Sequence, residues 1–224
     1  MKNILARGGI EFLAVMLGIS GSLWVDETRV TSNAENAFRT DLVAIHNELV
    51  DDLKTINDAI AINSDMIEKV DHLLSILETS KIDVNALDTI PLMNRKMENR
   101  SFFGKKTAYL SSKSAGHLNR HSHDPLVQEL TRLYGQTYSR METNNVLTDE
   151  LMFADDQSKI YLSHHLRGFI YNKNDFYQMV NSTDFYNWAV YMKNLFNHLI
   201  GVMEITQTHM EMVEPLLREE IKSQ

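Results

Sequence analysis

Hydrophobic residues recur along most of this chain with the spacing of helices. Between residues 40 and 78 the steps between apolar side chains are mostly three and four, and one wider gap holds polar Asn63. This spacing predicts one amphipathic helix with a heptad-like stripe, about 58 Å long at about 1.5 Å per residue. The stripe predicted to be buried is Leu42, Ile45, Leu49, Leu53, Ile56, Ile60, Ile67, Val70, Leu74 and Leu77. Acidic residues are assigned to the opposite face, and residues 80–85 are predicted to end the helix.

Glycine and proline mark the elements that follow the long helix. A helix over residues 84–98 is interrupted by Pro91. A second helix, over residues 107–115, ends at Gly116, which is typical of a C-terminal cap. Both are predicted to be shorter than the helix before them.

Asp124 followed by Pro125 is typical of a helix start, with an N-cap side chain and proline in the first turn. The face of this helix that is predicted to be buried carries Leu126, Leu130, Leu133, Tyr134, Met141 and Leu147. Another helix is predicted over residues 156–171, and a turn over residues 172–175.

A last long helix is predicted to open at Ser182 or Thr183 and to extend to about residue 221. Its apolar stripe is Phe185, Trp188, Met192, Leu195, Leu199, Val202, Met203, Met210, Val213 and Leu217. No segment of useful length has the period of a β-strand. Long amphipathic helices with short connections therefore predict an all-α protein, folded as an antiparallel bundle.

One short apolar run near the N-terminus is enclosed by charge. Lys2 and Arg7 precede the run, residues 10–25, and two acidic residues follow it. A helix over residues 4–25 would be about 33 Å long, enough to cross a hydrocarbon core of about 30 Å. Because the basic residues precede the helix, the positive-inside rule places the N-terminus in the cytoplasm.

This pattern predicts a single transmembrane helix that continues into the long-helix bundle. Residues 1–27 form the membrane anchor and residues 28–224 the extracytoplasmic domain. The expected location is the bacterial inner membrane, with the main domain in the periplasm. A cleaved signal peptide and a core helix of a soluble protein are alternative interpretations of the same run.

Small residues lie on one face of the predicted membrane helix. Ala14, Gly18 and Ser22 recur at every fourth position, and Glu11 lies three residues before the first of them. Such a ridge lets two membrane helices approach closely, and a carboxylate beside it would face the partner helix rather than lipid. These four residues are therefore the predicted packing surface of the anchor.

Composition and charge narrow the classes of function. The 224 residues include no cysteine, which excludes disulfides, thiolate metal sites and cysteine nucleophiles. The net charge of −8 argues against a nucleic-acid partner. Residues 95–120 reverse this balance, with seven basic residues and one acidic residue. This basic segment either folds back onto the acidic helices or contacts lipid headgroups.

Candidate chemistry is sparse. His117, His121 and His123 form the densest group of potential metal ligands, but Asp124 beside them is already needed as an N-cap and no second ligand motif completes a four-ligand site. A solvated loop is the simpler interpretation. The sequence holds no Ser/His/Asp signature, phosphate loop or dinucleotide fingerprint. Neither catalytic residues nor a cofactor are predicted, and the protein is not expected to be an enzyme.

Several short motifs resemble a family of uncharacterised bacterial proteins. These proteins have a short N-terminal membrane helix and a helical extracytoplasmic domain. The matching anchor residues are Glu11, Phe12, Val15, Gly18, Leu23, Val25, Asp26 and Glu27. Patchy similarity continues to residue 135, through the acidic helix around residues 49–53 and 67–74, the segments 108–112 and 115–118, and residues 130–134. The sequence departs from the family at Ala115, where serine is usual, and at Thr28, where tryptophan is common.

The resemblance implies this architecture and carries no activity. From the sequence we expect a structural or accessory protein that acts through protein contacts, either as a homo-oligomer or as a subunit of a larger membrane complex. The alternative is an extracytoplasmic ligand-sensing module. Because only about six residues precede the membrane helix, such a sensor would need a separate partner for its output.

Overall fold

The computed structural model describes residues 2–79, 81–83, 100–152 and 173–223, and for residues 2–14, 152 and 173–176 it describes the backbone alone. Within these ranges all regular structure is helical, which confirms the predicted all-α class. The elements are α1 (Lys2–Thr79), α3 (Thr107–Ser114), α4 (His117–Arg120), α5 (Pro125–Arg132), the π-helical turn η2 (Leu133–Thr137), α6 (Tyr138–Met152), α8 (Lys173–Val180) and α9 (Thr183–Ser223).

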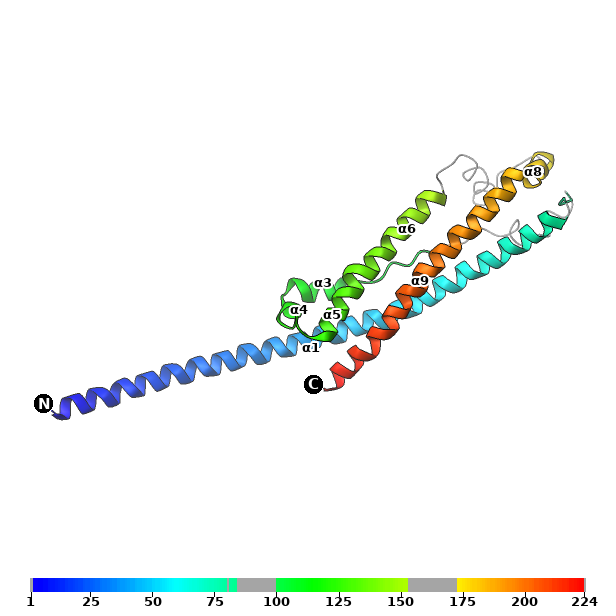
Figure 1. The fold of residues 1–224 in the computed structure, drawn as a ribbon. Coiled ribbons are helices and arrows are strands. Elements are labelled where there is room, and N and C mark those ends of the chain that lie inside the picture. The colour runs from blue at the N-terminus through cyan, green and yellow to red at the C-terminus, as the bar shows by residue number, and fades with distance from the viewer. Residues whose placement is uncertain (1, 80, 84–99, 153–172, 224) are drawn as a thin grey trace.

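The body of the protein is an antiparallel bundle. Helix α9 runs back along the C-terminal half of α1, and α6 lies beside α9 as the third long element (Figure 1). The short helices α3 and α4 pack on α1 at the end of the bundle where α9 finishes (Figure 1). At this end Arg39 donates a hydrogen bond to the carbonyl of Ile221 at 3.4 Å.

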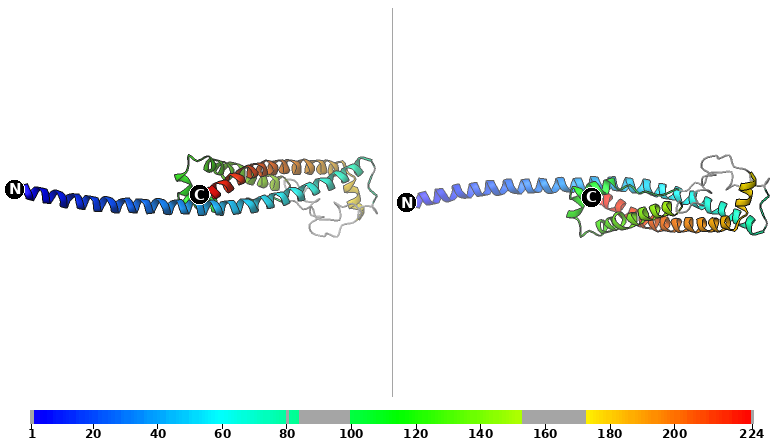
Figure 2. Two further views of the ribbon diagram at one scale, coloured as in Figure 1. Left: turned by 90° about the horizontal axis from the view of Figure 1, so that it is seen from below. Right: turned by 90° about the horizontal axis from the view of Figure 1, so that it is seen from above.

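The N-terminal half of α1 continues beyond the bundle without a neighbouring helix, as the two views in Figure 2 show. Every residue from 15 to 33 is exposed, and from residue 15 onward the first buried side chain is Phe38. Within the described part of the chain, no helix is both long and apolar enough to cross a membrane. The side chains of residues 1–14, which include part of the predicted span, lie outside that part.

Two apolar clusters fill the bundle. The first lies toward the end where α3 and α4 pack, and its largest fully buried side chains include Phe38, Leu42, Phe102, Leu130 and Tyr138. The second lies toward the far end and includes Met66, Val70, Phe185, Trp188 and Phe196. All ten residues of the stripe predicted for the last helix are buried, so this prediction is confirmed.

The buried face of α1 is shifted from the predicted stripe in the middle of the helix. Leu53, Ile60 and Ile67 are only half-buried. The fully buried positions run in steps of four and three: Phe38, Leu42, Ile45, Leu49, Asp52, Ile56, Ala59, Asn63, Met66, Val70 and Leu73. This is a regular heptad register. The prediction was wrong by one residue at each of these positions, because it selected the larger or branched apolar residue where the register instead places polar Asp52, small Ala59 and Met66.

Local signals at helix ends agree with the structure in three places. Gly116 has φ of 79°, which suits glycine after a helix C-terminus. The Asp124 side chain accepts a hydrogen bond from the backbone N–H of Leu126 at 2.8 Å, and the Ser182 hydroxyl accepts one from the N–H of Phe185 at 3.1 Å. Both are N-caps, so α5 and α9 begin where the sequence predicts.

Two local predictions were wrong, and two others lie outside the described residues. Residues 173–175 belong to α8 rather than to a turn. Leu147 is 45% exposed, because the second half of α6 presents this side to solvent rather than to the core. The helices predicted over residues 84–98 and 156–171 lie outside the described part of the chain.

Candidate functional site

An extended segment, residues 100–106, lies between α1 and α6, and we call it the strap. Among the described residues no strand lies beside its backbone, and buried side chains bind it instead. Asn63 donates to the carbonyl of Arg100 at 2.9 Å and accepts from the N–H of the same residue at 3.1 Å. Asn145 donates to the carbonyl of Phe102 at 2.6 Å. These amides satisfy backbone groups that would otherwise be buried without partners.

The carboxylate of Asp52 binds the strap further along. It accepts hydrogen bonds from the N–H of Lys105 at 2.8 Å and from the Tyr138 hydroxyl at 2.9 Å. Asp52 is 1% exposed, and burial raises the pKa of its carboxyl to about 6, against the opposing effect of these two hydrogen bonds. Burial likewise raises the pKa of the Tyr138 phenol.

Three buried tyrosines form a row that ends at this carboxyl group. Tyr109 stacks on Tyr134 with ring centroids 4.6 Å apart, and the Tyr134 ring meets that of Tyr138 edge-on at 5.1 Å. Each is at most 3% exposed. A substrate therefore has no access to Asp52 or Tyr138. Their buried hydrogen bonds hold the strap in place, and the two residues do not form a catalytic pair.

The raised pKa of Asp52 predicts a pH dependence of stability. Free aspartate titrates near 3.8, so between about pH 4 and 6 the unfolded chain is ionised at Asp52 while the folded protein still holds the proton. The contribution of Asp52 to the free energy of unfolding should therefore fall by about 3 kcal/mol as pH rises through this interval, and it should level off above about pH 7. Urea unfolding of the parent chain and of Asp52→Asn across this range measures the contribution. Identical slopes for the two proteins would contradict it.

The three candidate metal ligands make separate contacts. His117 pairs with Asp41 of α1 at 2.7 Å, and His121 stacks on Phe38 at 3.9 Å between ring centroids. His123 is exposed. No group of three His, Asp or Glu side chains suited to a metal ion occurs among the described residues. The first two histidines fasten α4 and the loop after it to α1.

Two of the basic residues in the predicted basic segment, Arg95 and Lys96, lie outside the described part of the chain, and the four from Lys105 onward differ in their partners. Lys105 pairs with Asp51 of α1 at 3.0 Å, and Lys106 pairs with Glu142 of α6 at 2.7 Å. These contacts agree with the interpretation that the segment folds onto acidic helices. Lys113 and Arg120 differ, because neither has a carboxylate partner among the described residues; Lys113 instead lies 5.7 Å from the centre of the Tyr109 ring.

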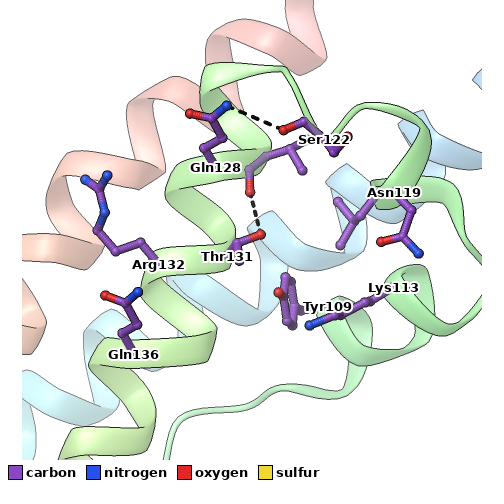
Figure 3. A pocket seen from close by; sticks show the side chains of 10 residues that line it. Tyr109, Lys113, Asn119, Ser122, Gln128, Thr131, Arg132 and Gln136 are labelled. Atoms are coloured by element: carbon purple, nitrogen blue, oxygen red, sulfur yellow. Dashed lines mark hydrogen bonds between the residues drawn. The ribbon is translucent and has the colours of Figure 1, made fainter.

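A hollow of about 390 Å³ opens between α3, α4, α5 and η2 (Figure 3). Its floor is formed by the buried residues Tyr109, Leu118 and Val127. Side-chain amides and hydroxyls on its rim belong to Asn119, Ser122, Gln128, Thr131 and Gln136. The π-helical turn adds one residue to the helix at this point and so changes the direction of the side chains that follow α5.

The hollow also carries two cations and, among the described residues, no acidic side chain lines it. Arg132 is already paired with Glu129 of the same helix at 2.8 Å. Lys113 has no such partner and lies beside Tyr109, across the hollow from α5 (Figure 3). The hollow therefore suits a ligand that combines an anionic group, hydrogen-bonding groups and a small apolar part.

The predicted packing residues of the anchor lie on the projecting part of α1. Gly18 and Ser22 are exposed, and a methyl group placed on Gly18 would have no other atom within 4 Å. The side chains of Glu11 and Ala14 lie outside the described part. The sequence did not identify Asp52, Asn145 or Gly104 as residues that hold the strap or lie in it. The one signal it offered was a polar residue at a heptad position of α1, as at Asn63.

Comparisons of the chain with protein-family models, curated proteins and solved structures find no match. The family resemblance suggested by the sequence motifs therefore stays a prediction.

Proposed function

We propose that the protein is a membrane-anchored helical accessory protein that acts through protein–protein contacts. The observation that carries this proposal is the projecting half of α1. Residues 15–33 are exposed along their whole length although they include Val15, Leu17, Ile19, Leu23 and Trp24, which are 58–72% exposed.

A lone helix with apolar residues on all sides is poorly suited to water. Most helices in proteins gain their stability from packing against other elements. An exposed apolar surface of this extent marks a site that lipid or another protein covers. Lipid would cover the segment before Asp26. A second helix would cover the small residues, which permit close approach.

The charge pattern supports one topology. With residues 1–27 as the anchor, the basic residues lie on the cytoplasmic side of the bacterial inner membrane and the bundle lies in the periplasm. In this arrangement Ala14, Gly18 and Ser22 face a second anchor helix, with Glu11 beside them. The partner is a second copy of the chain or a subunit of a larger membrane complex.

Membrane extraction and a reporter fusion test this proposal. The full chain should remain in the membrane after alkaline washing, and a reporter fused after Gln224 should be active outside the cytoplasm while Met1 is retained. In the same membranes Gly18→Leu should reduce crosslinking to a partner, because the larger side chain separates the helices, while insertion is unchanged. Release by alkaline washing, or cytoplasmic reporter activity, would overturn the anchor.

A ligand-sensing module remains the second candidate, and one observation favours it. The hollow between α3 and α5 has the size and the mixed polar and apolar lining of a small-molecule site. A sensor would change its contacts with an output partner when the hollow is filled. Partner crosslinking that depends on an added ligand would distinguish this candidate from a constitutive accessory subunit.

A further inference from the structure

Contacts with α1 fix the distance between the hollow and the predicted membrane segment. His117 of α4 pairs with Asp41 at 2.7 Å. The N–H of Ala108 in α3 donates to Glu48 at 3.1 Å. Asp41 and Glu48 follow Val25, the end of the segment, by 16 and 23 residues, which correspond to about 24 and 35 Å of helix. A headgroup layer does not extend so far, so this position favours a dissolved ligand over a lipid.

One unpaired cation sets the charge of that ligand. The Lys113 ammonium has no carboxylate partner among the described residues and lies 5.7 Å from the centre of the Tyr109 ring. The guanidinium of Arg132, the other cation of the lining, pairs with Glu129 at 2.8 Å and extends away from Tyr109 (Figure 3). A single ammonium balances the charge of a carboxylate, whereas a phosphate ester carries about −1.5 to −2 at neutral pH. No acidic side chain belongs to the described lining, so nothing balances a positive group on the ligand.

The polar rim offers hydrogen bonds on two sides of the hollow. The amide of Gln128 already donates to the carbonyl of Ser122 at 3.5 Å. Asn119 and Gln136 have no hydrogen-bond partner in the described part of the chain, and they lie on opposite sides of the hollow, in α4 and η2 (Figure 3). Each amide provides both a donor and an acceptor, which together match a hydroxyl group.

We propose that the hollow binds a small monocarboxylate that carries a hydroxyl group and an apolar group and has no positive charge. This inference rests on the sensing candidate, to which it adds a class of ligand. Lys113 binds the carboxylate, and the amides of Asn119 and Gln136 bind the hydroxyl group. The apolar group lies on the floor formed by Tyr109 and Leu118. Amino acids are rejected, because their ammonium group would have no carboxylate to pair with.

Saturation-transfer NMR of the full chain in neutral detergent, with mandelate as the probe, tests the inference. Mandelate combines a carboxylate, a hydroxyl group and a phenyl ring, and mandelamide is its uncharged counterpart. The parent chain should transfer saturation to the phenyl protons of mandelate and should bind mandelamide about tenfold more weakly. Lys113→Gln should weaken mandelate binding about tenfold, since a hydrogen bond to a charged group is lost, while Lys113→Arg should retain most of it. Lys113 is exposed, so both variants should melt as the parent does.

Lys193→Gln is the matched control. It also removes a positive charge, but the Lys193 ammonium pairs with Asp71 at 2.6 Å in the far half of the bundle. The control should bind mandelate as the parent does. Absence of saturation transfer at millimolar mandelate, equal affinity for mandelamide, or undiminished binding by Lys113→Gln would overturn the inference. Stronger binding of inorganic phosphate, or of phenylglycine, which has an ammonium in place of the hydroxyl group, would overturn it as well.

The outcomes separate this inference from the proposed function. Failure of mandelate binding in a chain that stays in alkaline-washed membranes overturns the carboxylate site alone. Release of the chain by alkaline washing overturns the anchor, whatever the binding measurement shows. Binding of mandelate without any change in partner crosslinking supports the site and overturns its role in sensing.

Discussion

Leu49→Asp is expected to abolish the cooperative unfolding transition of the bundle. Leu49 is fully buried in the heptad register of α1, within the first apolar cluster. An unpaired carboxylate at this position costs several kcal/mol, and the lost leucine packing adds about 2–5 kcal/mol. Together these approach the whole stability of a typical domain, about 5–15 kcal/mol. Thermal melting followed by far-UV circular dichroism should show no cooperative transition.

Leu53→Asp is the matched control on the next turn. Leu53 is half-buried against the same cluster, so water reaches the introduced carboxylate. We expect a loss of about 1–2 kcal/mol and a cooperative transition at lower temperature. If Leu53→Asp destabilised the protein more than Leu49→Asp, the heptad register that places Asp52 inside would be wrong.

Gly104→Ala is expected to displace the strap. A methyl group on Gly104 would lie 2.1 Å from Cε2 of the Tyr138 ring, far inside contact distance. The ring cannot easily move, because its hydroxyl is hydrogen-bonded to Asp52 and it makes edge-to-face contacts with the rings of Phe102 and Tyr134. The strap must shift instead and weaken the bond from Lys105 to Asp52. The expected cost is about 2–4 kcal/mol, measured by urea unfolding.

Gly201→Ala controls for the change from glycine to alanine. It lies inside α9, where a methyl group would meet no other atom within 4 Å. The lower backbone entropy of alanine should stabilise the helix by up to about 1 kcal/mol. Equal midpoints for Gly104→Ala and the parent chain would show that the strap does not depend on its contact with Tyr138.

The sequence alone determined the helices and their ends where local chemistry decides them. The N-caps at Asp124 and Ser182 and the glycine after α3 depend on a few neighbouring residues, so their effect can be recognised without the rest of the fold. The stripe of α9 was also predictable, because every buried position of this helix except Thr206 carries an apolar residue. The all-α class follows from these features together.

Only the tertiary structure decided which polar side chains of α1 lie inside the bundle. Sequence periodicity assigns Asp52 to the surface because it cannot anticipate that a strap lacking its own hydrogen-bonded neighbour will pass this helix. Once the strap is in place, its backbone groups need buried partners, and Asp52 and Asn63 supply them at heptad positions. The hollow is equally a product of packing, because its floor and rim come from four separate elements. Hydrophobic spacing is a local property, whereas the partners of buried polar groups are set by contacts between distant segments.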